Sequence, residues 1–202
     1  MTVSPGFAGR RRGGRRTDLP PGQYDEGAGW PVLTAEVTPH LDPQSWSMSV
    51  DGLVDTPSTW SWDEMHALPQ SDYDGPIHCV TTWSKFGMHW SGVSVDVLLD
   101  AVGVQKEAAY VLATSTTGYT TNLPLEHLRG GQAWVAWEAD GEPLTREHGG
   151  PVRLLVPHLY FWKSAKWVTR LTLLDHDMQG FWERNGYHDL GDPWREQRYQ
   201  GD

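Results

Sequence analysis

The order of apolar and polar residues predicts a chain built mostly from short strands. Trp46, Met48 and Val50 alternate with three serines, which is typical of a strand that buries one face. Further strands are expected where short apolar or β-branched runs are bounded by turn residues, at 76–80, 110–115, 133–137 and 167–174. Another apolar run, 151–157, begins and ends with proline.

Two helices are expected between these strands. Ser61 stands three residues before Glu64, which is the capping-box spacing and predicts a short helix ending near residue 68. Ser94 can cap a second helix whose apolar positions share one face: Val95, Leu98, Leu99 and Val102. After residue 175 the chain becomes polar and aromatic, as in an irregular surface segment. The predicted fold class is therefore α+β and β-rich.

Composition divides the chain into two parts. Residues 1–29 are rich in glycine, proline and arginine and poor in apolar residues, so they are predicted to form a flexible N-terminal segment. Residues 30–202 are expected to form one domain, because a chain of 202 residues suits a single core. Twelve tryptophans compensate for the modest apolar content of that core.

The charge of the chain is unevenly distributed. The net charge is −10, although five arginines lie within residues 10–16. Without these five, 11 basic residues stand against 26 acidic ones, and such a body repels the phosphate backbone of nucleic acids. The arginines lack the apolar run of an export signal, and no run is long enough to span a membrane. With only one cysteine, a cytoplasmic protein is expected.

That cysteine, Cys79, is the first candidate for chemistry. A lone thiol can be an inert core residue, a nucleophile, or a single soft ligand to a metal held mainly by something else. From composition alone the inert thiol is favoured. The polar neighbours His78, Thr81 and Ser84 weigh against a purely apolar position.

A second candidate site lies in residues 147–166. The segment His148-Gly149-Gly150 leaves backbone amides accessible, and Arg153 stands inside an apolar run where it needs a partner. Ser164 and Lys166 follow beside two tryptophans. The two cations suit an anion such as phosphate, or they pair with the abundant carboxylates; the spacing alone leaves both possibilities open.

Other sites find less support. The nine histidines show no zinc-binding spacing, and there is no nucleophile elbow, dinucleotide fingerprint or P-loop.

Four motifs together resemble one family. They are 78–84 with 90–93, 147–157, 160–167 and 181–187, and their order and content are similar to those of the sulfite oxidase family of molybdopterin-dependent oxidoreductases, in particular its short bacterial members. The resemblance extends over 30–194. It implies a sulfite-oxidase-type molybdopterin-binding fold with mixed sheets and short helices, and a molybdenum–molybdopterin cofactor.

The resemblance also assigns two catalytic residues. Cys79 matches the thiolate that binds molybdenum in this family, which agrees with a single soft ligand because the pterin dithiolene supplies further sulfurs. Tyr187 resembles the tyrosine that sulfite-oxidising members place over the substrate oxygen. A packing role in the C-terminal segment is the alternative for Tyr187.

Further residues are implied to bind the cofactor. Thr114 matches a cofactor contact on the strand after the helix, and His148 and Arg153 match residues at the pterin and its phosphate. The loop that completes the phosphate site corresponds to Ser164, Ala165 and Lys166.

The match has two departures. The segment 30–36 corresponds to one that carries a substrate-binding arginine in sulfite-oxidising members, and it contains none here. The family's C-terminal dimerisation domain and haem domain have no counterpart, so a monomer and a separate electron-transfer protein are expected. The function implied is oxygen-atom transfer on a small oxyanion. The alternatives are a sulfoxide reductase of the same fold and a non-enzymatic molybdopterin-binding protein.

Overall fold

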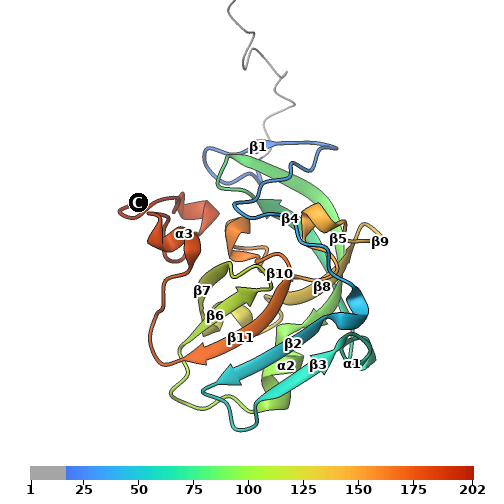
Figure 1. Cartoon of the computed structure of the whole chain (residues 1–202). Helices are drawn as coiled ribbons and strands as arrows, with labels where there is room; N and C mark the ends of the chain where they lie inside the picture. The colour runs from blue at the N-terminus through green and yellow to red at the C-terminus, as the bar shows by residue number, and fades with distance from the viewer. Residues whose placement is uncertain (1–16) are drawn as a thin grey trace, which may run out of the picture.

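A computed structural model describes residues 17–202 of the chain, so the arginine cluster at 10–16 lies outside the described residues. Two mixed β-sheets form the framework (Figure 1). The first sheet has the order β1-β5-β8-β10, with β4 also paired to β5 and β9 to β8. Its strands are β1 (Tyr24–Asp25), β4 (Ser71–His78), β5 (Trp83–Ser94), β8 (Trp134–Ala139), β9 (Glu142–Pro143) and β10 (Arg153–Leu155).

The second sheet has the order β3-β2-β11-β6-β7. Its central pair, β2 and β11, is parallel, and the remaining pairs are antiparallel. In Figure 1 this sheet crosses the lower half of the molecule, while the first sheet lies toward the upper right. Its strands are β2 (Ser47–Gly52), β3 (Ser58–Ser61), β6 (Tyr110–Ser115), β7 (Thr120–Pro124) and β11 (Val168–Leu174).

The helices are short and begin where the sequence predicts. Helix α1 (Trp62–Ala67) has both bonds of the capping box: Glu64 N donates to Ser61 Oγ at 3.4 Å, and Ser61 N donates to Glu64 Oε2 at 2.8 Å. Helix α2 (Val95–Val102) is capped by Ser94 and ends at Gly103. Helix α3 (Phe181–Arg184) lies in the C-terminal region that was expected to be irregular. Five 3-10 turns complete the elements: Pro43–Ser45, Leu125–Leu128, Arg146–His148, Phe161–Lys163 and Pro193–Arg195.

The main core lies between the inner faces of the sheets. Alternate residues of the second sheet are fully buried there, as strand geometry requires. The first sheet contributes Val93, Val135 and Leu154, and α2 contributes its whole apolar face. A smaller apolar cluster on the first sheet contains Cys79 and Trp83. The α+β, β-rich fold class is confirmed, and the lone cysteine stands at the edge of this smaller cluster.

The end of the predicted flexible segment is attached to the domain. Strand β1 pairs in parallel with β5, with Tyr24 opposite Trp83. The side-chain Nε2 of Gln23 donates to the carbonyl of Cys79 at 3.0 Å. The flexibility expected for 1–29 therefore does not extend to these residues. Hydrogen bonds of the main chain and of the Gln23 amide attach residues 23–25 to the domain. Such bonds do not require apolar side chains, so no hydrophobic pattern in the sequence predicts them.

Across residues 17–202, no helix has the length and apolar character needed to cross a membrane.

Candidate functional site

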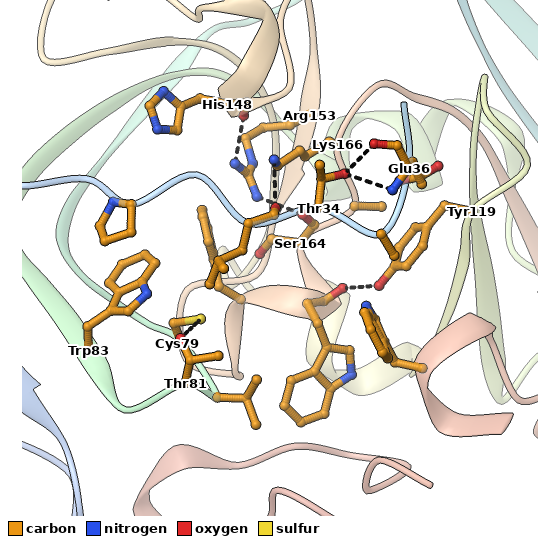
Figure 2. Close-up of a pocket in the computed structure, with 18 of the residues that line it drawn as sticks. Thr34, Glu36, Cys79, Thr81, Trp83, Tyr119, His148, Arg153, Ser164 and Lys166 are labelled. Carbon is orange, nitrogen blue, oxygen red and sulfur yellow. Dashed lines mark hydrogen bonds between the residues drawn. The ribbon is translucent and has the colours of Figure 1, made fainter. Parts of the chain in front are cut away.

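One open pocket gathers most of the residues that the motifs single out (Figure 2). It has a volume of about 280 Å³, and its walls come from the segment 30–36, the loop 79–83, Tyr119, the region 148–166 and the segment 182–187. Seven of the eight predicted site residues line it: Cys79, His148, Arg153, Ser164, Ala165, Lys166 and Tyr187. The structure thus joins motifs that are more than 100 residues apart.

Cys79 lies in a tight turn between β4 and β5. Its N–H donates to the carbonyl of Trp83 at 2.8 Å, and Thr82 N donates back to the carbonyl of Cys79 at 3.0 Å. Thr82 has φ 77°, in the left-handed region that β-branched residues seldom adopt. This turn places the sulfur at the pocket wall, 3.2 Å from Thr81 Oγ1 (Figure 2).

Cys79 is buried, with 7% of the residue exposed. Burial raises its pKa, and hydrogen bonding by Thr81 opposes this change. An isolated thiol at this place therefore keeps its proton at neutral pH. A metal ion can displace that proton, because it stabilises the thiolate directly.

Arg153, the first residue of β10, is a buried cation without an acidic partner. Its Nη1 donates to the carbonyl of His148 at 2.7 Å, and its Nη2 donates to the carbonyl of Ser164 at 2.8 Å. Its Cζ lies 3.9 Å from the centroid of the Phe161 ring. Within residues 17–202 it forms no ion pair with a carboxylate. Burial lowers its pKa to about 9, as expected for a cation that lacks a counter-charge.

Lys166 is a second cation beside Arg153. The two residues form an isolated antiparallel bridge, so their side chains start from neighbouring backbone. Lys166 Nζ donates to the carbonyls of Leu33 and Glu147, at 2.9 and 2.6 Å. Burial lowers its pKa to about 8, and the positive charge of Arg153 adds to this effect.

His148 and Gly149 shape the same wall. The His148 ring stacks on Trp30, with centroids 3.7 Å apart. Burial lowers the pKa of His148, so the ring is neutral at physiological pH. Gly149 has φ 107°, and a Cβ at this position would lie 3.1 Å from the Cβ atoms of both Arg153 and Lys166. Glycine is therefore required where the backbone passes the two cations.

Ser164 and Ala165 follow the 3-10 turn Phe161–Lys163 and stand directly before Lys166. Ser164 Oγ accepts a hydrogen bond from Val156 N at 2.9 Å, which fixes the turn against the strand that begins at Arg153. The carbonyl of Ala165 accepts from Leu154 N at 2.8 Å. Both residues line the pocket.

Tyr187 belongs to an aromatic wall on the other side of the pocket. Its ring centroid lies 5.1 Å from that of Trp162 and 4.8 Å from that of Trp182. Burial raises the pKa of Tyr187, so its hydroxyl stays protonated at neutral pH.

Thr114 does not line this pocket. It lies on β6, where Val111, Ala113 and Ser115 face the core and Thr114 points to the opposite, half-exposed face. Side chains alternate along a strand, so a residue next to the buried Ser115 cannot share its direction. Tyr119, just before β7, reaches the pocket instead, and its hydroxyl donates to the carbonyl of Trp162 at 2.7 Å.

Several pocket residues were missed from the sequence. Glu36 lines the pocket, accepts a hydrogen bond from Thr117 Oγ1, and has a pKa raised by burial. Trp83, Tyr119 and Trp162 also line it. They carry no motif of their own, although Trp83 and Trp162 stand within the recognised motifs.

These residues fit an anionic cofactor that carries a soft metal. Within residues 17–202 neither Arg153 nor Lys166 forms an ion pair with a carboxylate, which suits a phosphate group. No group of three or more His, Cys, Asp or Glu side chains in residues 17–202 is arranged to hold a metal ion. A metal at Cys79 would therefore take its other ligands from the cofactor. Fold and pocket together indicate a domain that binds an anionic, metal-bearing cofactor.

The particular family follows from comparison of sequences. The family model of the oxidoreductase molybdopterin-binding domain matches residues 35–182. The chain belongs to this family and is a molybdopterin-dependent oxidoreductase with a molybdenum cofactor. This match confirms the family predicted from the motifs, and with it the predicted fold and the predicted cofactor.

Individual relatives differ in length. The chain is 42% identical over 197 residues to the uncharacterized oxidoreductase YuiH of Bacillus subtilis, covering 97% of this chain and 99% of that protein. It is 32% identical over 151 residues to YedZ1, a putative protein-methionine-sulfoxide reductase subunit of Azospira oryzae, covering 75% and 57%. Mitochondrial sulfite oxidase of Drosophila melanogaster is 26% identical over 176 residues, covering 74% and 30%. The chain thus spans less than two thirds of the latter two proteins.

A solved structure has the same fold. The crystal structure of the sulfane dehydrogenase SoxCD from Paracoccus pantotrophus matches with a TM-score of 0.64 at 24% identity, covering 70% of this chain and 41% of the other. This match supports the sulfite-oxidase-type fold.

Proposed function

We propose that this oxidoreductase transfers an oxygen atom to or from a small sulfur compound and exchanges electrons with a separate carrier protein. The observation that carries the proposal is the arrangement of the pocket. One wall presents the buried thiol of Cys79, and another presents Arg153 and Lys166, neither of which forms an ion pair with a carboxylate of the described residues. The names of the sulfite oxidase and sulfoxide reductase relatives support a sulfur compound as substrate.

Different side chains of the pocket would bind the metal, the cofactor and the substrate. When bound, the cofactor supplies two-electron redox chemistry at molybdenum. Cys79 would provide the protein's thiolate ligand, and Arg153 and Lys166 would hold the phosphate through charge-assisted hydrogen bonds. Neutral His148, stacked on Trp30, would flank the pterin without adding charge. The protonated hydroxyl of Tyr187 would donate a hydrogen bond to the substrate oxygen.

Sulfoxide reduction is the second candidate, and the charge of the pocket favours it. Apart from Arg153 and Lys166, no lysine or arginine of the described chain lines the pocket, and Glu36 adds a carboxylate. If the cofactor phosphate occupies both cations, the pocket lining offers a sulfite dianion no other cationic side chain, whereas a neutral sulfoxide needs none. Arg198, whose charge acts on the thiol of Cys79, lies outside that lining.

One set of measurements tests both candidates. The protein, produced in cells that synthesise molybdopterin, is assayed with sulfite plus an electron acceptor and with sulfoxides plus an electron donor. Molybdenum and pterin at one per chain, with turnover of either substrate class, supports the proposal. If the protein carries one molybdenum and one pterin per chain but turns over neither sulfite nor sulfoxides, the proposal is overturned.

The cytoplasm is the proposed location, because an unpaired thiol suits a reducing compartment. Cell fractionation tests this assignment.

A further inference from the structure

A fully buried ion pair lies behind the aromatic wall of the pocket. Lys163 Nζ lies 2.7 Å from Glu183 Oε1, and both side chains are 0% exposed. Neither side chain lines the pocket, so the pair does not touch cofactor or substrate directly. Any effect of this ion pair on the pocket must therefore act through the pocket residues that it contacts.

The pair connects two segments that both contribute to the pocket. Lys163 ends the 3-10 turn Phe161–Lys163, directly before the Ser164–Lys166 loop, and Glu183 lies on α3, four residues before Tyr187. Lys163 Nζ also donates to the carbonyl and side-chain oxygens of Asn122 on β7, at 2.8 and 2.9 Å. Lys163 thus connects the C-terminal segment, through Glu183, to the Ser164–Lys166 loop and, through Asn122, to the second sheet.

Glu183 holds a pocket residue directly. Its Oε1 accepts a hydrogen bond from Trp162 Nε1 at 2.9 Å and one from Thr121 Oγ1 at 3.1 Å, in addition to the contact with Lys163. The other carboxylate oxygen, Oε2, is buried and has no hydrogen-bond partner among the described residues. All three donors therefore converge on a single oxygen, and that oxygen sets the orientation of the Trp162 indole.

The orientation of Trp162 bears on Tyr187. The two rings meet edge to face, with centroids 5.1 Å apart and planes at 73°. Trp182, the neighbour of Glu183 on α3, also packs against Tyr187, with ring centroids 4.8 Å apart. Tyr199 is the third aromatic neighbour, with centroids 5.5 Å apart. Glu183 thereby fixes two of the three aromatic neighbours of the tyrosine, one through a hydrogen bond and one through the backbone of α3.

Stability alone does not account for a carboxylate at this position. Replacing a buried ion pair by apolar residues of similar volume is often neutral or stabilising, because the desolvation of two charges offsets their attraction. An apolar pair would fill the space but would leave the indole N–H of Trp162 without an acceptor.

We infer that Glu183 is a positioning residue, which orients Trp162 through its Oε1 and thereby fixes Tyr187 at the substrate side of the pocket. This inference deepens the proposed function, since it rests on Tyr187 acting at the substrate oxygen. Glu183 serves as the hydrogen-bond acceptor for Trp162, and Lys163 compensates the negative charge that this buried carboxylate brings.

Two double variants separate the acceptor from the charge. Lys163→Met with Glu183→Gln is neutral and keeps an oxygen for Trp162, whereas Lys163→Met with Glu183→Leu is neutral and lacks it. Both lose the same contacts of Lys163, so they differ only at residue 183. The Leu variant is expected to show a kcat about 10- to 100-fold below that of the Gln variant, with similar KM and cofactor content.

A spectroscopic measurement does not depend on turnover. In the cofactor-loaded protein, the indole N–H resonance of Trp162, assigned by its loss in Trp162→Phe, is expected to exchange slowly with water in the wild type and the Gln variant. It is expected to exchange faster in the Leu variant. Equal exchange and equal kcat in the two double variants overturn the inference.

The outcomes also distinguish this inference from the proposed function. If the wild type is loaded but turns over neither sulfite nor sulfoxides, the proposed function fails, and indole exchange still decides whether Glu183 orients Trp162. If Lys163→Met prevents folding, the single variants Glu183→Gln and Glu183→Leu carry the test, because both remove the carboxylate charge and only Gln keeps an acceptor for Trp162 Nε1. A lower kcat and faster indole exchange in Glu183→Leu than in Glu183→Gln then support the inference, and equal values overturn it.

Discussion

The guanidinium of Arg153 lies 3.9 Å from the ring centroid of Phe161, and its nitrogens donate only to backbone carbonyls. This pairing explains how a cation is kept inside the protein next to the pocket without an acidic neighbour in the described chain. The aromatic face and the carbonyl oxygens partly compensate the lost hydration. They leave the net positive charge available for an anion that enters the pocket.

Arg153→Met is therefore expected to weaken cofactor binding far more than it weakens the fold. Losing a hydrogen bond to a charged group costs about 1.5–3 kcal/mol, which corresponds to roughly 10- to 150-fold in affinity. The pterin content of the purified variant and its melting temperature check this expectation. Arg153→Lys keeps a charge but not the planar fork, and should retain an intermediate amount of cofactor. Wild-type loading of the Met variant would contradict the assignment of Arg153 to the phosphate.

Cys79→Ala is expected to keep the fold and abolish turnover. The side chain is small and belongs to the minor apolar cluster, so its loss should cost about 1 kcal/mol of unfolding free energy. The metal would lose the protein's thiolate, which no other residue of the pocket can replace, because the described chain contains a single cysteine. Assays of the purified variant, with its molybdenum content measured, check this. Full turnover with molybdenum still bound would refute the role of Cys79.

Local patterns in the sequence predicted a large part of the fold. Strand β6 begins and ends where the apolar run does, and both capped helices form at their predicted serines. Strand β5 was missed, although it is 12 residues long and pairs with both β4 and β8. A register shift at Ser91/Gly92 and a positive φ at Gly87 interrupt its alternation, so the period of two holds only over residues 88–92 and not along the whole strand.

The site was predicted as far as its residues stand in motifs. Cys79, Arg153 and Lys166 do so, and the fold brings them together. Glu36 and Tyr119 reach the pocket from an irregular segment and a turn, and their place depends on long-range packing that local sequence does not encode. Thr114 does not line the pocket, because the register of β6 turns its side chain to the face opposite Ser115.

Gly149→Ala is expected to impair the site more than a comparable glycine substitution elsewhere. Gly149 and Gly141 both have positive φ, at 107° and 78°, so alanine at either position should cost about 1–2 kcal/mol through backbone strain. Only at Gly149 does the new methyl group meet Arg153 and Lys166, because nothing lies within 4 Å of a Cβ at Gly141. Gly149→Ala should therefore melt lower and lose cofactor, while Gly141→Ala keeps it. Equal cofactor content in the two variants would show that the close approach at Gly149 is not needed.

The affinity for the cofactor is expected to fall as the pH rises through about 8. Burial lowers the pKa of Lys166 to about 8, so in the cofactor-free protein this ammonium loses its proton above that pH. An anion binds the protonated form, and binding above pH 8 must therefore include uptake of a proton, which weakens it by up to about tenfold per pH unit. Cofactor release from wild type and from Lys166→Arg, measured between pH 6.5 and 9.5, tests this at about half-unit steps. Arginine stays charged over this range, so the variant should show a flatter profile; the same profile in both proteins would exclude Lys166 as the titrating group.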